Sequence, residues 1–322
     1  MEVITKMKRL IIYFFWDKDG IVDDYIPYML KAFKPFTAEL CMVVNGDINQ
    51  TGQEKVKPYV DNLLIRPNKG LDAEAYKYAL YQYGFDKLKE YDEVLCTNFT
   101  YFGPFYPLSE LFGSMDAREC DWWGLYRWPI ANPIYHHIPS YFVAYRKSLL
   151  CSPDFEEYWK TMKPISSYAE SCWFHEQRQT PYYDARGYKN AVYFENHFKY
   201  MDDWNDHWPL KDADKLIANE RFPFIKRRNF FLDEYMYRYK NTLERAVHYI
   251  CQNFDYDFKM ISDNILRTAN QVLLERSRRK LDKYKFNSEH ALFKRKREEN
   301  ARKYQSAVLM REYENLLNRK DV

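Results

Sequence analysis

Residues 91–108 read YDEVLCTNFTYFGPFYPL, and this stretch indicates the fold more clearly than any other part of the chain. A polar start leads into a short apolar strand, 94–96, which opens onto the small polar stretch 97–100. An aromatic-rich turn with glycine and proline follows. In an open α/β sheet, ligands bind just beyond the carboxyl ends of the strands. The polar residues at 97–100 are therefore placed to contact a ligand.

Alternating strand and helix signals before this stretch predict a mostly parallel sheet covered by helices on both faces. The expected elements are, in chain order, a strand over 10–15, a helix over 24–33, a strand over 38–44, a short helix from 51, a strand over 62–65 and a helix over 73–83. Thr51 opens a capping box, Asp72 is an expected N-cap, and Gly84 lies just past a helix end. The loop before Asp72 could instead offer backbone donors to a phosphate or sugar. Neither the dinucleotide-binding glycine pattern nor the P-loop pattern occurs.

Composition favours a globular protein of a reducing compartment. The 322 residues suit one large domain, with or without a smaller appendage. The 30 Tyr, 22 Phe and 8 Trp either stack on sugars or fill half-exposed core positions. The six cysteines are dispersed, without a C-x-x-C pair, which argues against a disulfide framework or a zinc site. With no evident signal peptide or membrane-spanning run, we expect a cytoplasmic protein, soluble or peripheral at the inner face of the membrane.

The charge is divided unevenly along the chain. Residues 226–322 carry 23 Lys and Arg against 14 Asp and Glu, a net charge of +9, whereas the rest carries 26 against 32, a net charge of −6. We therefore predict an α/β domain over 1–230 and a basic α-helical extension over 231–322. Basic clusters at 276–285 and 294–297 suit a solvated helix face, self-association or peripheral membrane docking. No nucleic-acid partner is expected.

Five ordered motifs resemble the rhamnan synthesis protein F family of bacterial glycosyltransferases. They are 68–78 (NKGLDAEAYKY), 91–108 (quoted above), 120–125 (CDWWGL), 137–142 (HIPSYF) and 221–227 (RFPFIKR). The resemblance covers roughly residues 8–231. It implies a GT-A-like sheet, a nucleotide-activated sugar donor and a glycan or undecaprenyl-linked acceptor in capsule or cell-wall polysaccharide assembly. Rhamnose from dTDP-rhamnose is the expected sugar.

The chain departs from the family pattern at one position, where Phe99 stands in place of an Asp after Asn98. Carboxylate oxygens suit Mg²⁺ and Mn²⁺, and phenylalanine offers no ligand. This argues against a divalent metal at the loop, so we assign no metal ligand and no cofactor. Basic residues could neutralise the donor phosphates, another carboxylate could bind a metal, or the protein could be a glycan-binding or scaffolding subunit without turnover.

Glycosyl transfer needs donors for the leaving diphosphate and a base near the acceptor hydroxyl. The expected donor-binding residues are Asn68, Gly70, Asp72, Lys77, Asn98 and Thr100, with Arg127 and Arg146 as further diphosphate candidates. The expected acceptor-binding residues are Trp122, Trp123, Ser140 and Tyr141. The expected catalytic residues are Asp121, His137 and the weaker base candidate Glu170.

Several of these residues also have a purely structural interpretation. Lys77 could lie on a solvated helix face, and Asp121 could cap a turn beside core tryptophans. Glu170 could be a surface carboxylate. His136, next to His137, falls outside the motif match and is expected to be structural.

Overall fold

The computed structural model describes residues 7–128, 137–195, 211–231 and 240–269. At the centre of these residues lies a seven-stranded sheet in the order β3-β2-β1-β4-β7-β6-β8. Its strands are β1 (Arg9–Phe15), β2 (Glu39–Asn45), β3 (Asn62–Arg66), β4 (Glu93–Asn98), β6 (Trp122–Tyr126), β7 (Phe142–Arg146) and β8 (Asn190–Phe194). Beyond the carboxyl end of β4, β5 (Tyr101–Phe102) pairs with β9 (Ile225–Lys226).

The sheet is mostly parallel. β1 runs parallel to both β2 and β4, β2 to β3, and β6 to β8, whereas β7 runs antiparallel to β4 and β6. The predicted α/β fold, with a mostly parallel sheet flanked by helices, is thereby confirmed. The strand order reverses between β1 and β4, which is where open α/β sheets form a ligand crevice.

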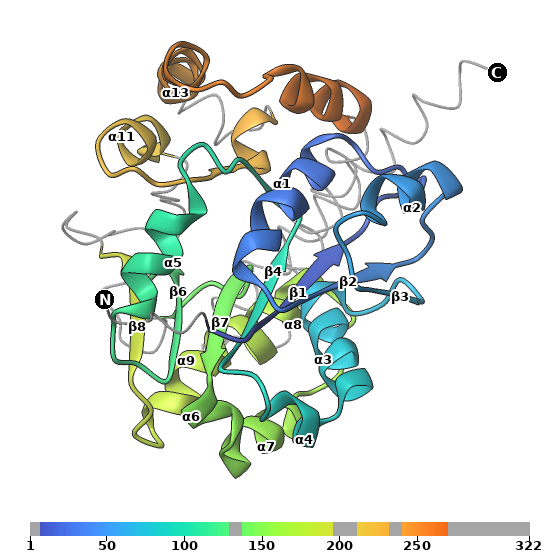
Figure 1. The fold of residues 1–322 in the computed structure, drawn as a ribbon, viewed down its shortest axis with the longest axis vertical. Helices are drawn as coiled ribbons and strands as arrows, with labels where there is room; N and C mark the ends of the chain where they lie inside the picture. The colour runs from blue at the N-terminus through green and yellow to red at the C-terminus, as the bar shows by residue number, and fades with distance from the viewer. Residues whose placement is uncertain (1–6, 129–136, 196–210, 232–239, 270–322) are drawn as a thin grey trace, which may run out of the picture.

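Helices cover both faces of the sheet (Figure 1). One face packs against α1 (Tyr25–Phe33), η1 (Lys34–Phe36), α2 (Gln50–Val56), α5 (Leu108–Asp116), α11 (Ala213–Ala218) and α13 (Lys240–Asn253). The other packs against α3 (Leu71–Tyr83), α4 (Phe85–Leu88), α6 (Lys147–Leu150), α7 (Pro153–Thr161) and α9 (Gln177–Asp184). Three further short segments are α8 (Tyr168–Ser171), η3 (Cys172–Glu176), which is a π-helix, and η4 (Arg227–Phe230).

Strand β1 shows why the sheet is buried on both sides. All seven of its residues are buried, as expected for a parallel strand with helices on either face. Because side chains alternate along a strand, Ile11 and Tyr13 join the core under α1, whereas Leu10 and Ile12 join the core under α3.

The structure corrects two helix starts predicted from the sequence. Asn49, rather than Thr51, caps α2, because its side chain accepts a hydrogen bond from the Gly52 N–H (2.7 Å). Gly70, rather than Asp72, is the N-cap residue of α3. Gly84 closes α3 as predicted, with its N–H donating to the Leu80 carbonyl (3.0 Å).

A buried ionic cluster lies at the amino edge of the sheet, around Glu93. Arg9 donates to this carboxylate at 2.5 Å, the Trp123 indole at 2.7 Å, and Arg146 forms an ion pair with it at 2.7 Å. Arg9 also pairs with Asp116 (2.7 Å). Glu93 is fully buried, so this carboxylate links β1, β4, β6 and β7 out of contact with water.

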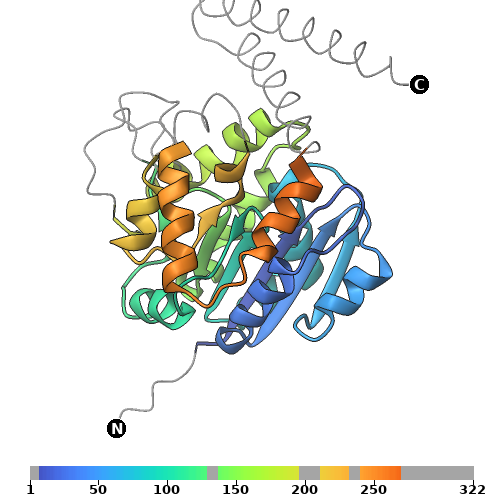
Figure 2. The same ribbon diagram turned by 90° about the horizontal axis from the view of Figure 1, so that it is seen from above.

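Residues 240–269 pack against the same core as α1, and Figure 2 shows both helical segments, in orange, on that side of the sheet. Ala246 and Ile250 of α13 and Ile261 of helical residues 259–269 are fully buried there. The division into domains 1–230 and 231–322 stays a prediction, and the basic clusters at 276–285 and 294–297 lie outside the described residues, as does His136. Within the described part of the chain, no helix has the length and apolarity to span a membrane.

Candidate functional site

The carboxyl end of β4 begins a chain of polar contacts. Asn98 is 2% exposed, and its side-chain amide donates to the Asp72 carboxylate (3.0 Å). The Asn98 carbonyl oxygen accepts hydrogen bonds from the N–H (3.1 Å) and the hydroxyl (2.7 Å) of Thr100. Two predicted donor-binding segments, far apart in sequence, therefore meet at this strand end.

The start of α3 places Asp72 beside β4. Gly70 adopts a left-handed conformation (φ 70°), which lets the chain turn from the loop into the helix. Because Gly70 takes the N-cap position, Asp72 lies inside the first turn and accepts from the Ala73 N–H through only one oxygen (3.0 Å). Its other oxygen is thereby left to face Asn98.

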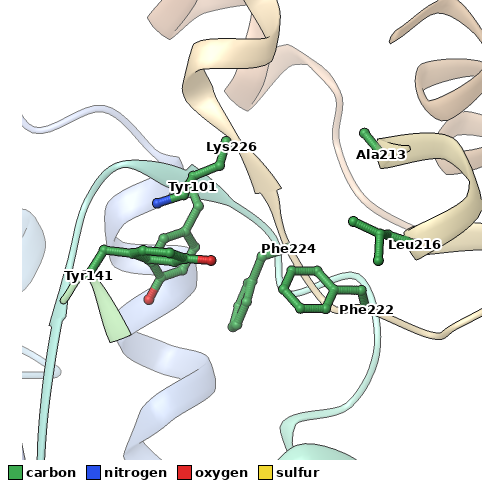
Figure 3. Close-up of a pocket in the computed structure, with 7 residues that line it drawn as sticks. All are labelled: Tyr101, Tyr141, Ala213, Leu216, Phe222, Phe224 and Lys226. Atoms are coloured by element: carbon green, nitrogen blue, oxygen red, sulfur yellow. The ribbon is translucent and has the colours of Figure 1, made fainter. Parts of the chain in front are cut away.

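Lys226 reaches the same place from β9. Its backbone pairs with Tyr101 of β5, and its ammonium lies 3.3 Å from the Thr100 hydroxyl. The ammonium also lies 2.8 Å from the centre of the Tyr141 ring, a cation–π contact. Figure 3 shows the Lys226 amine beside these two tyrosines, at one side of a small pocket. That pocket is lined by Tyr101, Tyr141, Ala213, Leu216, Phe222, Phe224 and Lys226.

Glu176 completes the arrangement from the end of the π-helical segment η3. One carboxylate oxygen accepts from both the N–H (3.0 Å) and the hydroxyl (3.1 Å) of Ser140. The other lies 3.4 Å from Nε2 of His137. Ser140 precedes β7, which runs antiparallel to β4, so it lies at the same edge of the sheet as Asn98. π-helical turns occur often at functional sites.

We name these side chains together the carboxyl-edge cluster. Its members are Asp72, Asn98, Thr100, His137, Ser140, Tyr141, Glu176 and Lys226. Sequence reasoning had selected all of them except Glu176 and Lys226.

The charges in the carboxyl-edge cluster influence one another. Burial, together with the charge of Glu176, raises the pKa of Asp72. Burial also raises the pKa of Glu176, but hydrogen bonds and charge from His137, with hydrogen bonds from Ser140, outweigh it and lower this pKa to about 2. Burial lowers the pKa of Lys226 well below its usual range, against the opposing pull of Glu176 and Asp72. The site thus holds an ionised carboxylate, a more basic carboxylate and an amine that protonates less readily than usual.

Asp121, the predicted base, lies at the opposite edge of the sheet. Trp122 pairs with Tyr145, which pairs in turn with Val94, so Asp121 lies level with the start of β4. At 3.3 Å per residue, this is roughly 16 Å from the Asn98 end. The Asp121 carboxylate accepts from the Ser148 hydroxyl and the Lys189 N–H. The prediction of a catalytic role for Asp121 does not fit this placement.

Trp122 and Trp123 do not fit the predicted acceptor role either. Both rings are fully buried, on opposite faces of β6. Trp122 packs near Tyr183, and the Trp123 indole donates to Glu93. A sugar cannot stack on either ring in this structure, and their role is to fill the core.

Glu170 is held in a capping box at the start of α8. Its carboxylate accepts from the Ser166 N–H and hydroxyl and from the Ser167 N–H, and its own N–H donates to the Ser167 side chain. This local bonding gives Glu170 a structural role at the start of α8.

Other predicted donor contacts point elsewhere. Lys77 donates to the Met162 carbonyl (3.3 Å), on the side of α3 that faces α7. Arg146 belongs to the buried ionic cluster, and Arg127 donates to Asn190. Asn68 is exposed in the loop after β3, near Gly70 but without a described hydrogen bond to the cluster.

Glu176 and Lys226, the two cluster residues that were not predicted, both lie in segments that the sequence had already singled out. Lys226 lies within the quoted motif 221–227, and Glu176 lies in the same predicted helix as Glu170. No spacing in the sequence predicts their positions, because β5–β9 pairing brings Lys226 to Thr100, and Glu176 meets Ser140 from the end of the π-helical segment.

With the geometry established, family comparison identifies the chain. The family model described as rhamnan synthesis protein F matches residues 40–319. The chain belongs to the rhamnan synthesis protein F family. The predicted family is thereby confirmed. No curated protein matches the chain in sequence.

Solved structures resemble the chain only distantly. A putative nucleotide-diphospho-sugar transferase from Desulfovibrio desulfuricans G20 shares 17% identity, with a TM-score of 0.37, over 76% of this chain and 97% of that one. A cytidylyltransferase from Leptospira borgpetersenii shares 14%, with a TM-score of 0.36, over 78% and 98%. Glucosyl-3-phosphoglycerate synthase from Mycobacterium tuberculosis shares 13%, with a TM-score of 0.32, over 44% of this chain; the chain spans 58% of that enzyme.

Proposed function

We propose that this protein transfers a rhamnosyl group from dTDP-rhamnose to a bacterial surface polysaccharide or an undecaprenyl-linked glycan. The observation that carries the proposal is the carboxyl-edge cluster. It puts two carboxylates and an amine where open α/β sheets bind ligands. Membership of a family named for rhamnan synthesis supports rhamnose as the sugar.

We assign the donor sugar to the Asp72 side of the cluster. A carboxylate and a primary amide, 3.0 Å apart and already oriented by Ala73 and Thr100, can accept from and donate to neighbouring sugar hydroxyls. The other carboxylate of the cluster, Glu176, is then left for the acceptor.

We assign the acceptor to Glu176, with Ser140 and His137 holding its carboxylate in place. A group with a pKa of about 2 is ionised at neutral pH but is a weak base. It takes the proton late, when the acceptor oxygen has begun to bond to the anomeric carbon and has become acidic. The bond from that carbon to the diphosphate breaks, and its electron pair leaves with the nucleoside diphosphate.

The same proposal places the enzyme at the inner face of the membrane. The basic clusters at 276–285 and 294–297 would then contact anionic lipid, although they lie outside the described residues.

A transfer assay with the full-length chain tests the proposed function. Purified protein is incubated with an undecaprenyl-linked glycan primer and with dTDP-rhamnose, UDP-glucose or UDP-galactose. The masses of the products are then measured by mass spectrometry. We expect one deoxyhexose to be added from dTDP-rhamnose. Binding of dTDP-rhamnose without transfer or hydrolysis would contradict the proposal and support a subunit that binds glycan without turnover.

A further inference from the structure

The end of β4 does not suit the divalent metal that a GT-A-like fold implies. The Asn98 oxygen already accepts two hydrogen bonds from Thr100. Phe99 follows with a ring that packs edge-on against Phe14 (5.7 Å) and Phe15 (5.6 Å) and offers no ligand atom. Across the described residues, no three His, Cys, Asp or Glu side chains gather in a way that could hold a metal ion.

Two cationic side chains flank this strand end instead. Lys226 lies against the Thr100 hydroxyl and the Tyr141 ring, as described above. The Arg227 guanidinium lies 5.3 Å from the centre of the Phe99 ring and 5.7 Å from that of Tyr25. When both side chains are protonated, they disfavour a metal ion beside them and favour an anion.

The backbone fixes both cations to β4. The Arg227 N–H donates to the Thr100 carbonyl (3.0 Å), next to the β5–β9 pairing at Lys226. The Arg227 side chain donates to the neutral oxygens of Asn264 (3.0 Å) and Thr268 (3.4 Å), and within the described ranges it forms no ion pair with a carboxylate. Arg267, from the same helical segment, is different, because it pairs with Asp17 and Asp23 at 2.7 and 2.6 Å.

These residues lie close to the surface, although the Lys226 amine itself is shielded from solvent. Phe99, Thr100, Lys226 and Arg227 are all partly exposed, in contrast to the buried Asn98. Lys226 and Arg227 therefore lie nearer to the surface than the end of β4 itself.

We propose that Lys226 and Arg227 bind the diphosphate of the donor and stabilise it as the leaving group, in the place where related folds use a metal ion. This inference rests on the proposed function, because it assumes a nucleoside-diphosphate donor. As the anomeric carbon–oxygen bond breaks, the electron pair moves onto the diphosphate, and the two cations balance the added negative charge. Glu176 keeps the acceptor proton, so atoms and charge are conserved.

The ionisation of Lys226 predicts a pH dependence of donor binding. Burial holds the pKa of Lys226 low in the free protein, and an anionic diphosphate beside it raises that pKa again. Binding of dTDP then takes up a proton. The affinity for dTDP therefore falls as the pH rises from the Lys226 pKa of the free protein to that of the complex. The charged and titratable groups that face Lys226 are Asp72, Tyr101, Tyr141, Glu176 and Arg228.

Calorimetry above about pH 7, where the phosphates are fully ionised, measures this change in dTDP affinity with pH. Lys226→Arg should flatten the profile, and an unchanged slope in that variant would contradict the assignment.

Calorimetric titration with dTDP, in excess EDTA and in Mg²⁺, tests the inference directly. We expect the full-length protein to bind dTDP equally well in both buffers. Lys226→Met and Arg227→Gln should each weaken binding by about 10- to 100-fold, as expected for loss of a charged hydrogen-bond donor. Lys226→Arg should restore most of the affinity.

The matched control is Lys31→Met, which replaces an exposed lysine on α1, and this variant should bind dTDP as the unaltered protein does. Phe99→Asp should make binding stronger in Mg²⁺ than in EDTA.

The outcomes separate this inference from the proposed function. If dTDP binds only in Mg²⁺, or if folded Lys226→Met and Arg227→Gln bind dTDP normally, Lys226 and Arg227 do not bind the diphosphate. The transferase proposal still stands in that case. If neither dTDP nor UDP binds in either buffer, both proposals fail. Circular dichroism of each variant verifies that it is folded.

Discussion

Glu176→Gln is expected to lower kcat for sugar transfer by about 10²- to 10⁴-fold, the usual contribution of a general base. Glutamine has nearly the same shape and can still accept from Ser140 through its carbonyl oxygen. It removes the negative charge beside His137 and cannot take the acceptor proton. The protein should remain folded and should bind dTDP, so kcat falls while donor affinity changes little.

Glu170→Gln is the matched control, because it makes the same chemical change six residues earlier in neighbouring helical turns. Glutamine serves in a capping box nearly as well as glutamate. Kcat should therefore be unchanged, and a transfer assay on both variants decides between the carboxylates. If Glu170→Gln loses activity and Glu176→Gln does not, the structural assignment of the base is wrong.

Glu93→Ala is expected to lower the free energy of unfolding by about 3–5 kcal/mol, the cost of removing one partner from a buried ion pair. The substitution leaves Arg9 and Arg146 buried without their shared carboxylate and leaves the Trp123 indole without its acceptor. Desolvated positive charges are far more costly than the lost contacts alone. Urea denaturation followed by circular dichroism measures the change.

Glu90→Ala gives the comparison on the surface. Glu90 pairs with Lys8 at 3.6 Å, and the two side chains are 64% and 50% exposed. Such pairs contribute less than about 1 kcal/mol. Equal losses in the two variants would show that the buried cluster around Glu93 does not stabilise the sheet as described.

Much of the fold could be predicted because its signals are local. The apolar run in β1, the glycine after α3 and the polar residues after β4 each act within a few residues of chain. Alternation of such strands and helices suffices to predict a parallel sheet. The helix starts were harder, because Asn49 and Thr51, or Gly70 and Asp72, are all acceptable caps, and the turn geometry selects between them.

The site was predicted in part. Asn98, Thr100 and Asp72 could be found from the strand-end rule and the family motifs, and the structure brings them within hydrogen-bond reach. Asp121 and the tryptophans after it looked equally suitable in the sequence. The tryptophans belong to β6, which runs in the same direction as β4, and Asp121 precedes this strand. Asp121 therefore lies at the opposite edge of the sheet from Asn98, and the two tryptophan rings lie in the core.

The sequence alone determined the class of sheet, the family and the place along the chain where a ligand should bind. These follow from periodicity, turn residues and motifs, which are properties of neighbouring residues. Only the tertiary structure decided which distant charges share an environment. It buried Glu93, which the sequence presents as the polar start of a strand, between two arginines. It also brought Lys226 to Thr100 and Glu176 to Ser140. Electrostatic interactions depend on distance in space and on burial, and neither is written in the spacing of residues along the chain.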